Sequence, residues 1–218
     1  AQSEAATGKK FVKYWFHSEF LLVDGRKMSK SLNNFYTIDD VKKQGFEPLA
    51  LRYLFLQTHY RTFSNFTWRA LKSAQEGYKN LKEMVLSLKK QKQRQSLSEE
   101  KLAQLDNLRS EFIGALNNDL QMPEALAVVW SLIKSNIPSM DKYDLILEFD
   151  QILGLNLAEV EEEKIPEEII KLAKERKKAR ENKNFKLADE IRKKIKDKGW
   201  EITDINGEYK INKERFNL

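Results

Sequence analysis

Apolar residues recur every three to four positions between residues 68 and 153, and this periodicity constrains the fold more than any other feature. The longest stripe comprises Trp68, Leu71, Tyr78, Leu81, Val85 and Leu88. Three shorter stripes follow, joined by polar or proline-containing links. Each stripe is typical of an amphipathic helix that buries one side. Four such helices with short links predict an antiparallel helical bundle over residues 67–158.

Local signals place several helix ends. Thr37 to Asp40 forms a capping box, in which a hydroxyl and a carboxylate three residues apart satisfy the free amides of a helix start. Pro48 opens an almost wholly apolar helix, which we expect to be buried. Helix starts are predicted in the same way at Thr67, Ser98, Pro123 and Asn184, and helix ends at Gly45, Gly154 and Gly199.

The first and last parts of the chain differ from the bundle. Residues 11–23 are rich in aromatic and β-branched side chains and are predicted to be extended, with a tight turn at Asp24-Gly25. The acidic run 159–165 predicts a linker. Residues 166–218 predict two helices and a hairpin turning at Asn206-Gly207. The fold class expected is therefore mainly α, with a short strand and turn before the bundle and a small α+β module after it.

Composition limits the possible functions. The chain has no cysteine and two histidines, His17 and His59, which disfavours a metal site built within it. No apolar run is long enough for a membrane span and no signal peptide is recognisable, so a soluble, cytoplasmic protein is expected. The net charge of +6 lies entirely after residue 163, where 17 Lys and Arg face 11 Asp and Glu. A basic module suggests a polyanionic partner, although a solvated lysine-rich helix explains the charge equally well.

The segment Lys27-Met28-Ser29-Lys30-Ser31 is the strongest chemical signal. Two ammonium groups three residues apart, two hydroxyl groups and the amides of a short loop suit a triphosphate. In adenylate formation a carboxylate attacks the α-phosphate and pyrophosphate leaves. A lysine that reaches the leaving oxygens in the transition state accelerates that step.

The string KMSKS after a strand and turn resembles the signature loop of class I aminoacyl-tRNA synthetases, and its surroundings resemble the cysteinyl-tRNA synthetase family. The similarity covers nearly the whole chain. It rests on DGRKMSKSLNNFYTIDDV, on HYR at 59–61 with NF at 65–66, on LNNDLQMPEAL at 116–126 and on NKNFKLADEIR near the C-terminus.

The resemblance implies an ATP-dependent ligase that activates cysteine with Mg²⁺ and transfers it to tRNA(Cys). Residues 1–66 would hold the end of the catalytic domain with its loop and a stem-contact fold, 67–158 a tRNA-binding bundle, 159–165 a linker and 166–218 an anticodon-binding module. Lys30 would be the principal ATP contact. Arg61 would be a candidate contact to the tRNA acceptor stem, and Arg180, Phe185, Asp189 and Asp204 would read the anticodon.

Those residue types suit base recognition, since arginine pairs with guanine acceptors, carboxylates accept from base amino groups and exposed aromatic rings stack on bases. Phe185 could instead be a core residue, and Arg180 and Asp189 ordinary surface charges. Two positions depart from the family pattern. Asn33 replaces a glycine, although asparagine tolerates left-handed backbone, and Phe185 replaces a tryptophan and lacks its indole donor.

The resemblance also implies parts that these residues do not contain. The HxGH-type sequence and the zinc ligands of the family's cysteine-selecting site would precede Ala1, so we expect a fragment whose N-terminal catalytic half belongs to the same polypeptide. Alone, the chain is expected to bind tRNA weakly and not to aminoacylate. His17 could line the adenine or aminoacyl pocket or be a hydrogen-bonded structural residue, and His59 is expected to position the helix junction.

Two other readings remain. A related ligase that joins cysteine to an amino sugar shares the loop and the adenylate chemistry, but it needs no anticodon module, so the basic C-terminal module disfavours it. A stand-alone RNA-binding helical protein with a vestigial loop is the alternative from another class. It would bind RNA in a salt-dependent manner with little preference among tRNAs.

Overall fold

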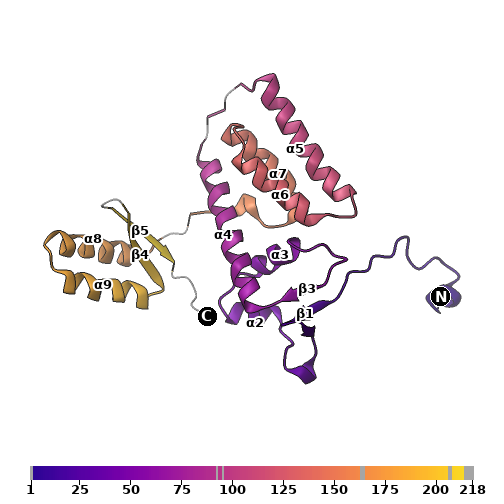
Figure 1. Ribbon diagram of the computed structural model, residues 1–218, viewed down its shortest axis with the longest axis horizontal. Helices are drawn as coiled ribbons and strands as arrows, with labels where there is room; N and C mark the ends of the chain where they lie inside the picture. The colour runs from indigo at the N-terminus through magenta and orange to yellow at the C-terminus, as the bar shows by residue number, and fades with distance from the viewer. Residues whose placement is uncertain (1, 92, 95, 163–164, 206–207, 214–218) are drawn as a thin grey trace. The chain divides into compact units, whose positions relative to one another are not determined.

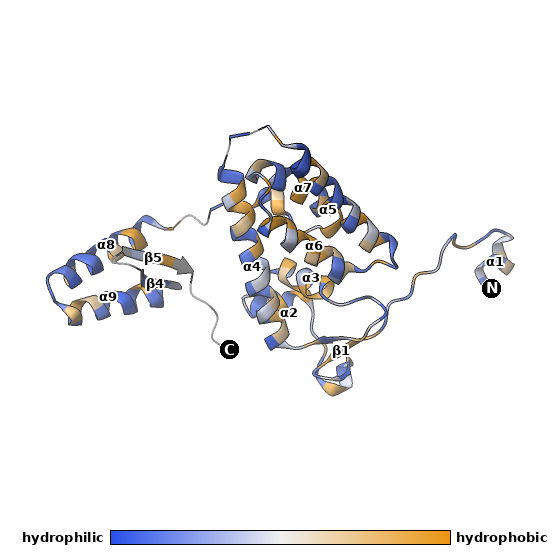
Figure 2. Cartoon of the chain, turned by 45° about the horizontal axis from the view of Figure 1, so that its top comes forward, coloured by the Kyte–Doolittle hydropathy of each residue, from blue (hydrophilic) through white to orange (hydrophobic). Residues whose placement is uncertain are grey.

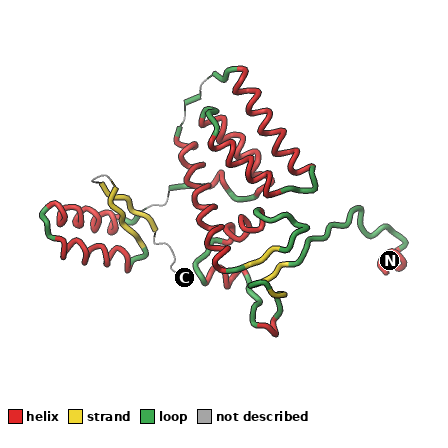
Figure 3. The backbone as a smooth tube through the Cα atoms, viewed as in Figure 1, coloured by secondary structure: helices red, strands yellow, loops and turns green. Residues whose placement is uncertain are grey.

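The computed structural model describes residues 2–91, 93–94, 96–162, 165–205 and 208–213. The chain divides into two compact units, Ala1–Val160 and Glu161–Leu218. Helices are the main regular structure of both units, with a few short strands (Figure 3), and this confirms the predicted mainly α fold class. The division falls after Val160, inside the run 159–165 that the sequence predicts to be a linker.

The elements of the first unit are the helices α1 (Gln2–Thr7), α2 (Ile38–Lys43), α3 (Pro48–Leu56), α4 (Trp68–Lys90), α5 (Glu99–Asn117), α6 (Met122–Lys134) and α7 (Ser139–Leu153), the 3-10 turns η1 (Lys30–Leu32) and η2 (Leu157–Glu159), and the strands β1 (Leu21–Val23), β2 (Arg26–Lys27) and β3 (Ser64–Phe66). Those of the second are α8 (Glu167–Glu181), α9 (Phe185–Asp197), β4 (Trp200–Ile205) and β5 (Glu208–Lys213) (Figure 1).

Side-chain caps begin four of these helices where the sequence places them. A side-chain oxygen accepts a hydrogen bond from the backbone N–H three residues ahead at Thr37, Thr67, Ser98 and Asn184. At Thr37 the reciprocal bond to Asp40 completes the capping box. Pro48 lies in the first turn of α3 and Pro123 in that of α6, and Gly154 ends α7 in left-handed backbone.

Helices α3 to α7 pack together around one hydrophobic core. The predicted stripe of α4 is buried at Leu71, Tyr78, Leu81, Val85 and Leu88. Helix α3 is buried on most sides, as its sequence predicts, and packs against α4 and α6. The same core includes Val23 of β1 and Leu157 of η2. The predicted segments 1–66 and 67–158 therefore share a core, and their separation into functional domains stays a prediction.

A three-stranded sheet in the order β2-β1-β3 lies beside α2 and α3 (Figure 1). Strand β1 pairs antiparallel with β2 and parallel with β3. The sequence predicts residues 11–23 to be extended with a short strand, and the strand is Leu21–Val23, the last three residues of that stretch. A strand needs a hydrogen-bonded neighbour, and β3 offers one only to those three residues.

The second unit is the predicted small α+β module. Helices α8 and α9 form a hairpin, and α9 packs against β4, which pairs antiparallel with β5. Its core is made of Ile169, Ala173, Ile191, Ile195 and Ile202. Much of α8 and α9 is coloured hydrophilic in Figure 2. The predicted turn at residues 206–207 lies outside the described residues.

No helix within the described ranges combines the length and the apolar character that crossing a membrane would require.

Candidate functional site

A tight hairpin presents the Lys27–Ser31 segment. Asp24 and Gly25 both have positive φ, 50° and 73°, and they connect Val23 of β1 to its partner Arg26 of β2. Two positive φ values in a two-residue connection are typical of a type I′ turn, whose twist matches that of the strands. The N–H of Gly25 donates to the side-chain oxygen of Asn65 at 2.9 Å. The hairpin is thus fastened to β3.

The segment after the hairpin folds into a compact turn with its own hydrogen bonds. The Ser29 hydroxyl accepts from the N–H of Leu32 and lies 3.2 Å from the Ser31 hydroxyl. Asn34 spans the turn: its Oδ1 accepts from the N–H of Ser29 at 2.8 Å and its Nδ2 donates to the carbonyl of Lys27 at 3.1 Å. Asn33 adopts left-handed backbone with φ 50° and ψ 28°, as predicted for this position.

Both lysines of the segment are exposed, and no carboxylate within the described ranges is at ion-pair distance from either ammonium group. Lys30 Nζ lies 5.9 Å from the centre of the exposed Phe35 ring. Met28, between the two lysines, packs against the core of the unit. One side of the segment is therefore anchored, while its two positive charges face solvent and can accept an anion.

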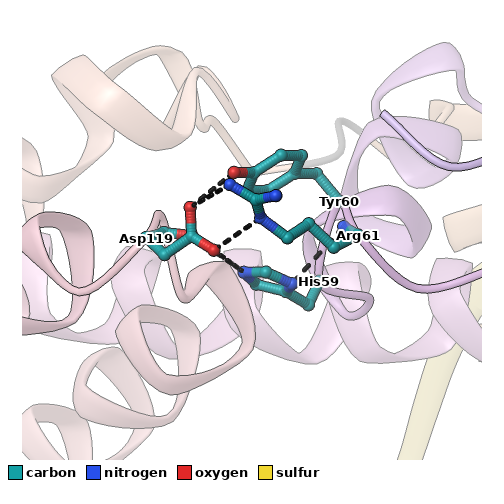
Figure 4. A network of polar contacts seen from close by, with 4 residues as sticks. All are labelled: His59, Tyr60, Arg61 and Asp119. Atoms are coloured by element: carbon teal, nitrogen blue, oxygen red, sulfur yellow. Dashed lines mark hydrogen bonds and ion pairs between the residues drawn. The ribbon is translucent and has the colours of Figure 1, made fainter. Parts of the chain in front are cut away.

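A second polar cluster joins the α3–β3 loop to the turn between α5 and α6 (Figure 4). His59 Nε2 lies 2.8 Å from the Asp119 carbonyl oxygen, the Tyr60 hydroxyl donates to the Asp119 carboxylate, and Arg61 Nε donates to the same carboxylate at 2.7 Å. Asp119 and Leu120 are consecutive residues at φ 55°. Left-handed backbone is unfavourable for a branched residue such as leucine, so the three contacts hold a turn that is poorly populated by itself.

The electrostatics of this cluster follow from the shared carboxylate. Hydrogen bonds from Arg61 and then from Tyr60 lower the pKa of Asp119, and the bond to Asp119 raises the pKa of Tyr60. His59 lies at the junction where the sequence predicts a positioning role. Arg61, the predicted acceptor-stem contact, already pairs with Asp119, but its side chain is 66% exposed and part of its guanidinium remains open to a phosphate.

The residues implied in anticodon reading lie in the second unit, and three of them are near one another in its fold. The guanidinium of Arg176 donates to both oxygens of Asp204, at 2.8 and 2.9 Å, and Arg180 donates to the same carboxylate. Asp189 is exposed and close enough to raise the pKa of Arg176. Phe185, the first residue of α9, is 59% exposed and is not part of the core.

His17 is exposed and its ring stacks on Trp15, with 6.0 Å between centroids, so neither a lined pocket nor a hydrogen bond of its ring is seen in the part of the chain that the structure covers. The described residues also contain no group of three His, Cys, Asp or Glu side chains arranged to hold a metal ion. These described residues therefore offer no ligand set for zinc.

Part of the chain matches a known family model. Residues 1–76, which include the hairpin and the Lys27–Ser31 turn, match the family model described as "tRNA synthetases class I (C) catalytic domain". The chain is further similar to proteins named cysteine–tRNA ligase: 38% identical to that of Treponema denticola over 95% of this chain and 47% of that protein, 35% to that of Chlamydia muridarum over 98% and 49%, and 36% to that of Brachyspira hyodysenteriae over 94% and 46%.

These homologues confirm the similarity to cysteine–tRNA ligases that the sequence motifs indicate. The chain spans about half the length of the curated relatives that it matches.

Sequence reasoning missed the partners that hold the candidate residues in place. Asn34 is one, and it lies within DGRKMSKSLNNFYTIDDV. Asp119 is another, and it lies within LNNDLQMPEAL. The position of Arg176 could have been recognised from the sequence. It falls on the same helical face as Ile169, Ala173 and Ala179, and a charged residue on a buried face needs a partner of opposite charge.

Proposed function

We propose that this chain is the C-terminal portion of a cysteine–tRNA ligase. It supplies the loop that contacts ATP during cysteine activation, and it supplies the surfaces that hold tRNA(Cys). The observation that carries the proposal is the Lys27–Ser31 turn, internally bonded and with both lysines open to an anion, in a chain whose homologues are cysteine–tRNA ligases.

In the proposed reaction the carboxylate of cysteine attacks the α-phosphorus of ATP. The bond between that phosphorus and the bridging oxygen breaks, and pyrophosphate leaves with the bonding electrons. Negative charge grows on the leaving oxygens, so an ammonium group beside them stabilises the transition state more than the ground state. Lys30 is assigned this role, with Lys27 and the Ser29 and Ser31 hydroxyl groups as further contacts. Mg²⁺ would accompany the triphosphate and share its charge.

The tRNA would contact both units. Arg61 is assigned to a phosphate of the acceptor stem, and the bundle of residues 67–158 to the tRNA body. Arg180, Phe185, Asp189 and Asp204 are assigned to the anticodon, where the exposed Phe185 ring can stack on an unpaired base. The enzyme is expected to act in the cytoplasm, and its HxGH and zinc-binding half to belong to the same polypeptide.

Binding of tRNA by this 218-residue chain tests the proposal. We expect tRNA(Cys) to bind more tightly than the same tRNA with one anticodon base changed, by about 1 to 3 kcal/mol for each altered contact. Equal affinity for the two tRNAs, falling steeply with salt, would contradict the proposal and favour a stand-alone RNA-binding protein with a vestigial loop.

Pyrophosphate exchange provides a second test. The chain alone, given ATP, Mg²⁺ and cysteine, is expected to show no exchange above background, because the residues that would bind the adenosine and the cysteine thiol are assigned to the other half. Exchange by the isolated chain would refute that assignment.

A further inference from the structure

Arg176 occupies an unusual position for an arginine. It lies on the face of α8 that also buries Ile169, Ala173 and Ala179, and only 4% of the residue is exposed. Its guanidinium cannot lose its proton to avoid the cost of burial. The cost must be offset by a partner, and Asp204 on β4 accepts from both terminal nitrogens of the group.

The two arginines on this carboxylate are held differently. Arg176 makes a bidentate contact from a buried side chain, 5% exposed. Arg180 makes a single contact, to Oδ2, from a side chain that is 44% exposed. Bidentate pairing fixes the plane of a carboxylate, whereas one contact from an exposed side chain is exchanged easily with water or a ligand.

This arrangement leaves recognition groups facing solvent. A carboxylate has about four acceptor positions. Arg176 occupies one on each oxygen and Arg180 a second on Oδ2, so Oδ1 of the half-exposed Asp204 keeps an acceptor. The charge of Asp189 also acts on Arg176, so two arginines are accompanied by two carboxylates, and these four side chains together carry no net charge.

We propose that Arg176 is a positioning residue for base recognition: it holds the Asp204 carboxylate in one orientation, so that an unpaired base can donate an amino group to Asp204 while Arg180 transfers from Asp204 to an acceptor on the base. The ligand class is a base whose exposed edge carries an amino group beside an oxygen or nitrogen acceptor. This inference rests on the proposed function, since it explains how that site would read its RNA.

The first test uses the unsubstituted chain. Its arginine side chains are labelled with nitrogen-15, and the guanidinium signals are followed by NMR while tRNA(Cys) is added. We expect the Arg180 signals to shift and those of Arg176 to stay in place. Shifts of equal size at both residues, or no shift at Arg180 in the complex, would overturn the proposal that Arg180 leaves Asp204 to bind the base.

The second test compares variants by their discrimination, the ratio of the dissociation constants for tRNA(Cys) and for tRNA(Cys) with one anticodon base changed. The unsubstituted chain is expected to discriminate about 5- to 150-fold. Arg176→Lys keeps the charge but loses the bidentate contact, and we expect the ratio to fall toward one. Lys198→Gln is the control, because it removes a cation and the ion pair with Glu168 from the same module. We expect this variant to raise the dissociation constants of both tRNAs by the same factor.

The outcomes separate this inference from the proposed function. If Arg176→Lys weakens the binding of both tRNAs by the same factor, the discrimination ratio is preserved. Arg176 then has a structural role only, and the inference is wrong. If the unsubstituted chain itself shows a ratio of one, the proposed function fails. In that case the ion pairs can still be tested by following the pH titration of the Asp204 carboxyl carbon. The titration midpoint should rise more in Arg176→Lys than in Arg180→Gln. An equal rise would contradict the proposal that Arg176 holds Asp204 more firmly than Arg180 does.

Discussion

Asp204 shows how one carboxylate links recognition to stability. Hydrogen bonds from Arg176 lower its pKa most, and the charges of Arg176 and Arg180 lower it further. An aspartate in an unfolded chain has a pKa of about 3.9. Because the folded value is lower, the ionised form contributes stability above that pH, and the contribution is lost as the pH falls through the folded pKa.

We therefore expect the C-terminal unit to lose stability below about pH 4, as measured by urea titration of the amide signals of α8 and α9 at a series of pH values. The variant Asp204→Asn cannot take up this proton. Its loss of stability over the same pH range should therefore be smaller, by the contribution of one carboxyl group. It starts from a lower stability, since Arg176 stays buried without its counter-charge. Parallel pH curves for the two proteins would contradict the assignment.

In the first unit, Asp119 controls the pKa of a neighbouring tyrosine, Tyr60. Its hydrogen bond from the Tyr60 hydroxyl is the largest cause of the raised pKa of that tyrosine. In Asp119→Asn the side chain keeps its shape and its tolerance of left-handed backbone, but it loses the charge. We expect the pKa of Tyr60 to fall toward the ordinary value for tyrosine, as followed by carbon-13 NMR of the labelled rings. Tyr78 serves as the internal reference, because burial raises its pKa and the substitution should not change that pKa.

At the scale of elements, the short helix α2 depends on its first turn. It is six residues long, and isolated helices of that length are unstable. The Thr37 hydroxyl accepts from the N–H of Asp40, and the Asp40 carboxylate accepts from the N–H of Thr37. Two of the amides that a helix start leaves unpaired are thereby satisfied.

Thr37→Ala should lower the stability of α2 by about 1 kcal/mol, seen as faster amide hydrogen exchange from residue 38 to residue 43. Thr67→Ala removes the equivalent cap of α4, a helix of 23 residues whose stripe is buried in the core. Its interior amides should change little. If both variants altered exchange only at the substituted turn, the dependence of α2 on its cap would be disproved.

At the scale of the whole molecule, the two units have separate cores of very different size. The core of the first unit draws on α3 to α7 and on β1 and β3, whereas that of the second rests on a few isoleucine and alanine side chains. Small cores leave little stability to spare. The unit that carries the candidate base-reading residues is therefore the more easily unfolded one.

Ile195→Ala tests this independence. Ile195 is fully buried in the second unit, and its truncation should cost about 2 to 5 kcal/mol, enough to unfold that unit at room temperature. We expect the amide signals of residues 166–205 to collapse to unfolded positions while those of α4 to α7 stay unchanged. Leu81→Ala, at an equally buried site in the first unit, should lower the stability of that unit and leave the amide signals of residues 166–205 unchanged. Joint loss of both sets of signals would show that the units fold as one.

The amino-acid sequence by itself determined the features that depend on neighbours along the chain. Caps, helix ends, the tight turn at Asp24-Gly25 and the left-handed Asn33 are set by contacts a few residues apart, so each could be predicted from its local pattern. The Lys27–Ser31 segment could be identified in the same way, because its chemistry is contained in five consecutive residues.

Only the tertiary structure decided the contacts between distant segments. Strand β1 pairs with β3, and this pairing sets the strand at Leu21–Val23 within the predicted extended stretch 11–23. Asp119 meets Arg61 across 58 positions, and Asp204 meets Arg176 across 28. A carboxylate's partner is chosen by how helices and strands pack, and no local pattern encodes that choice.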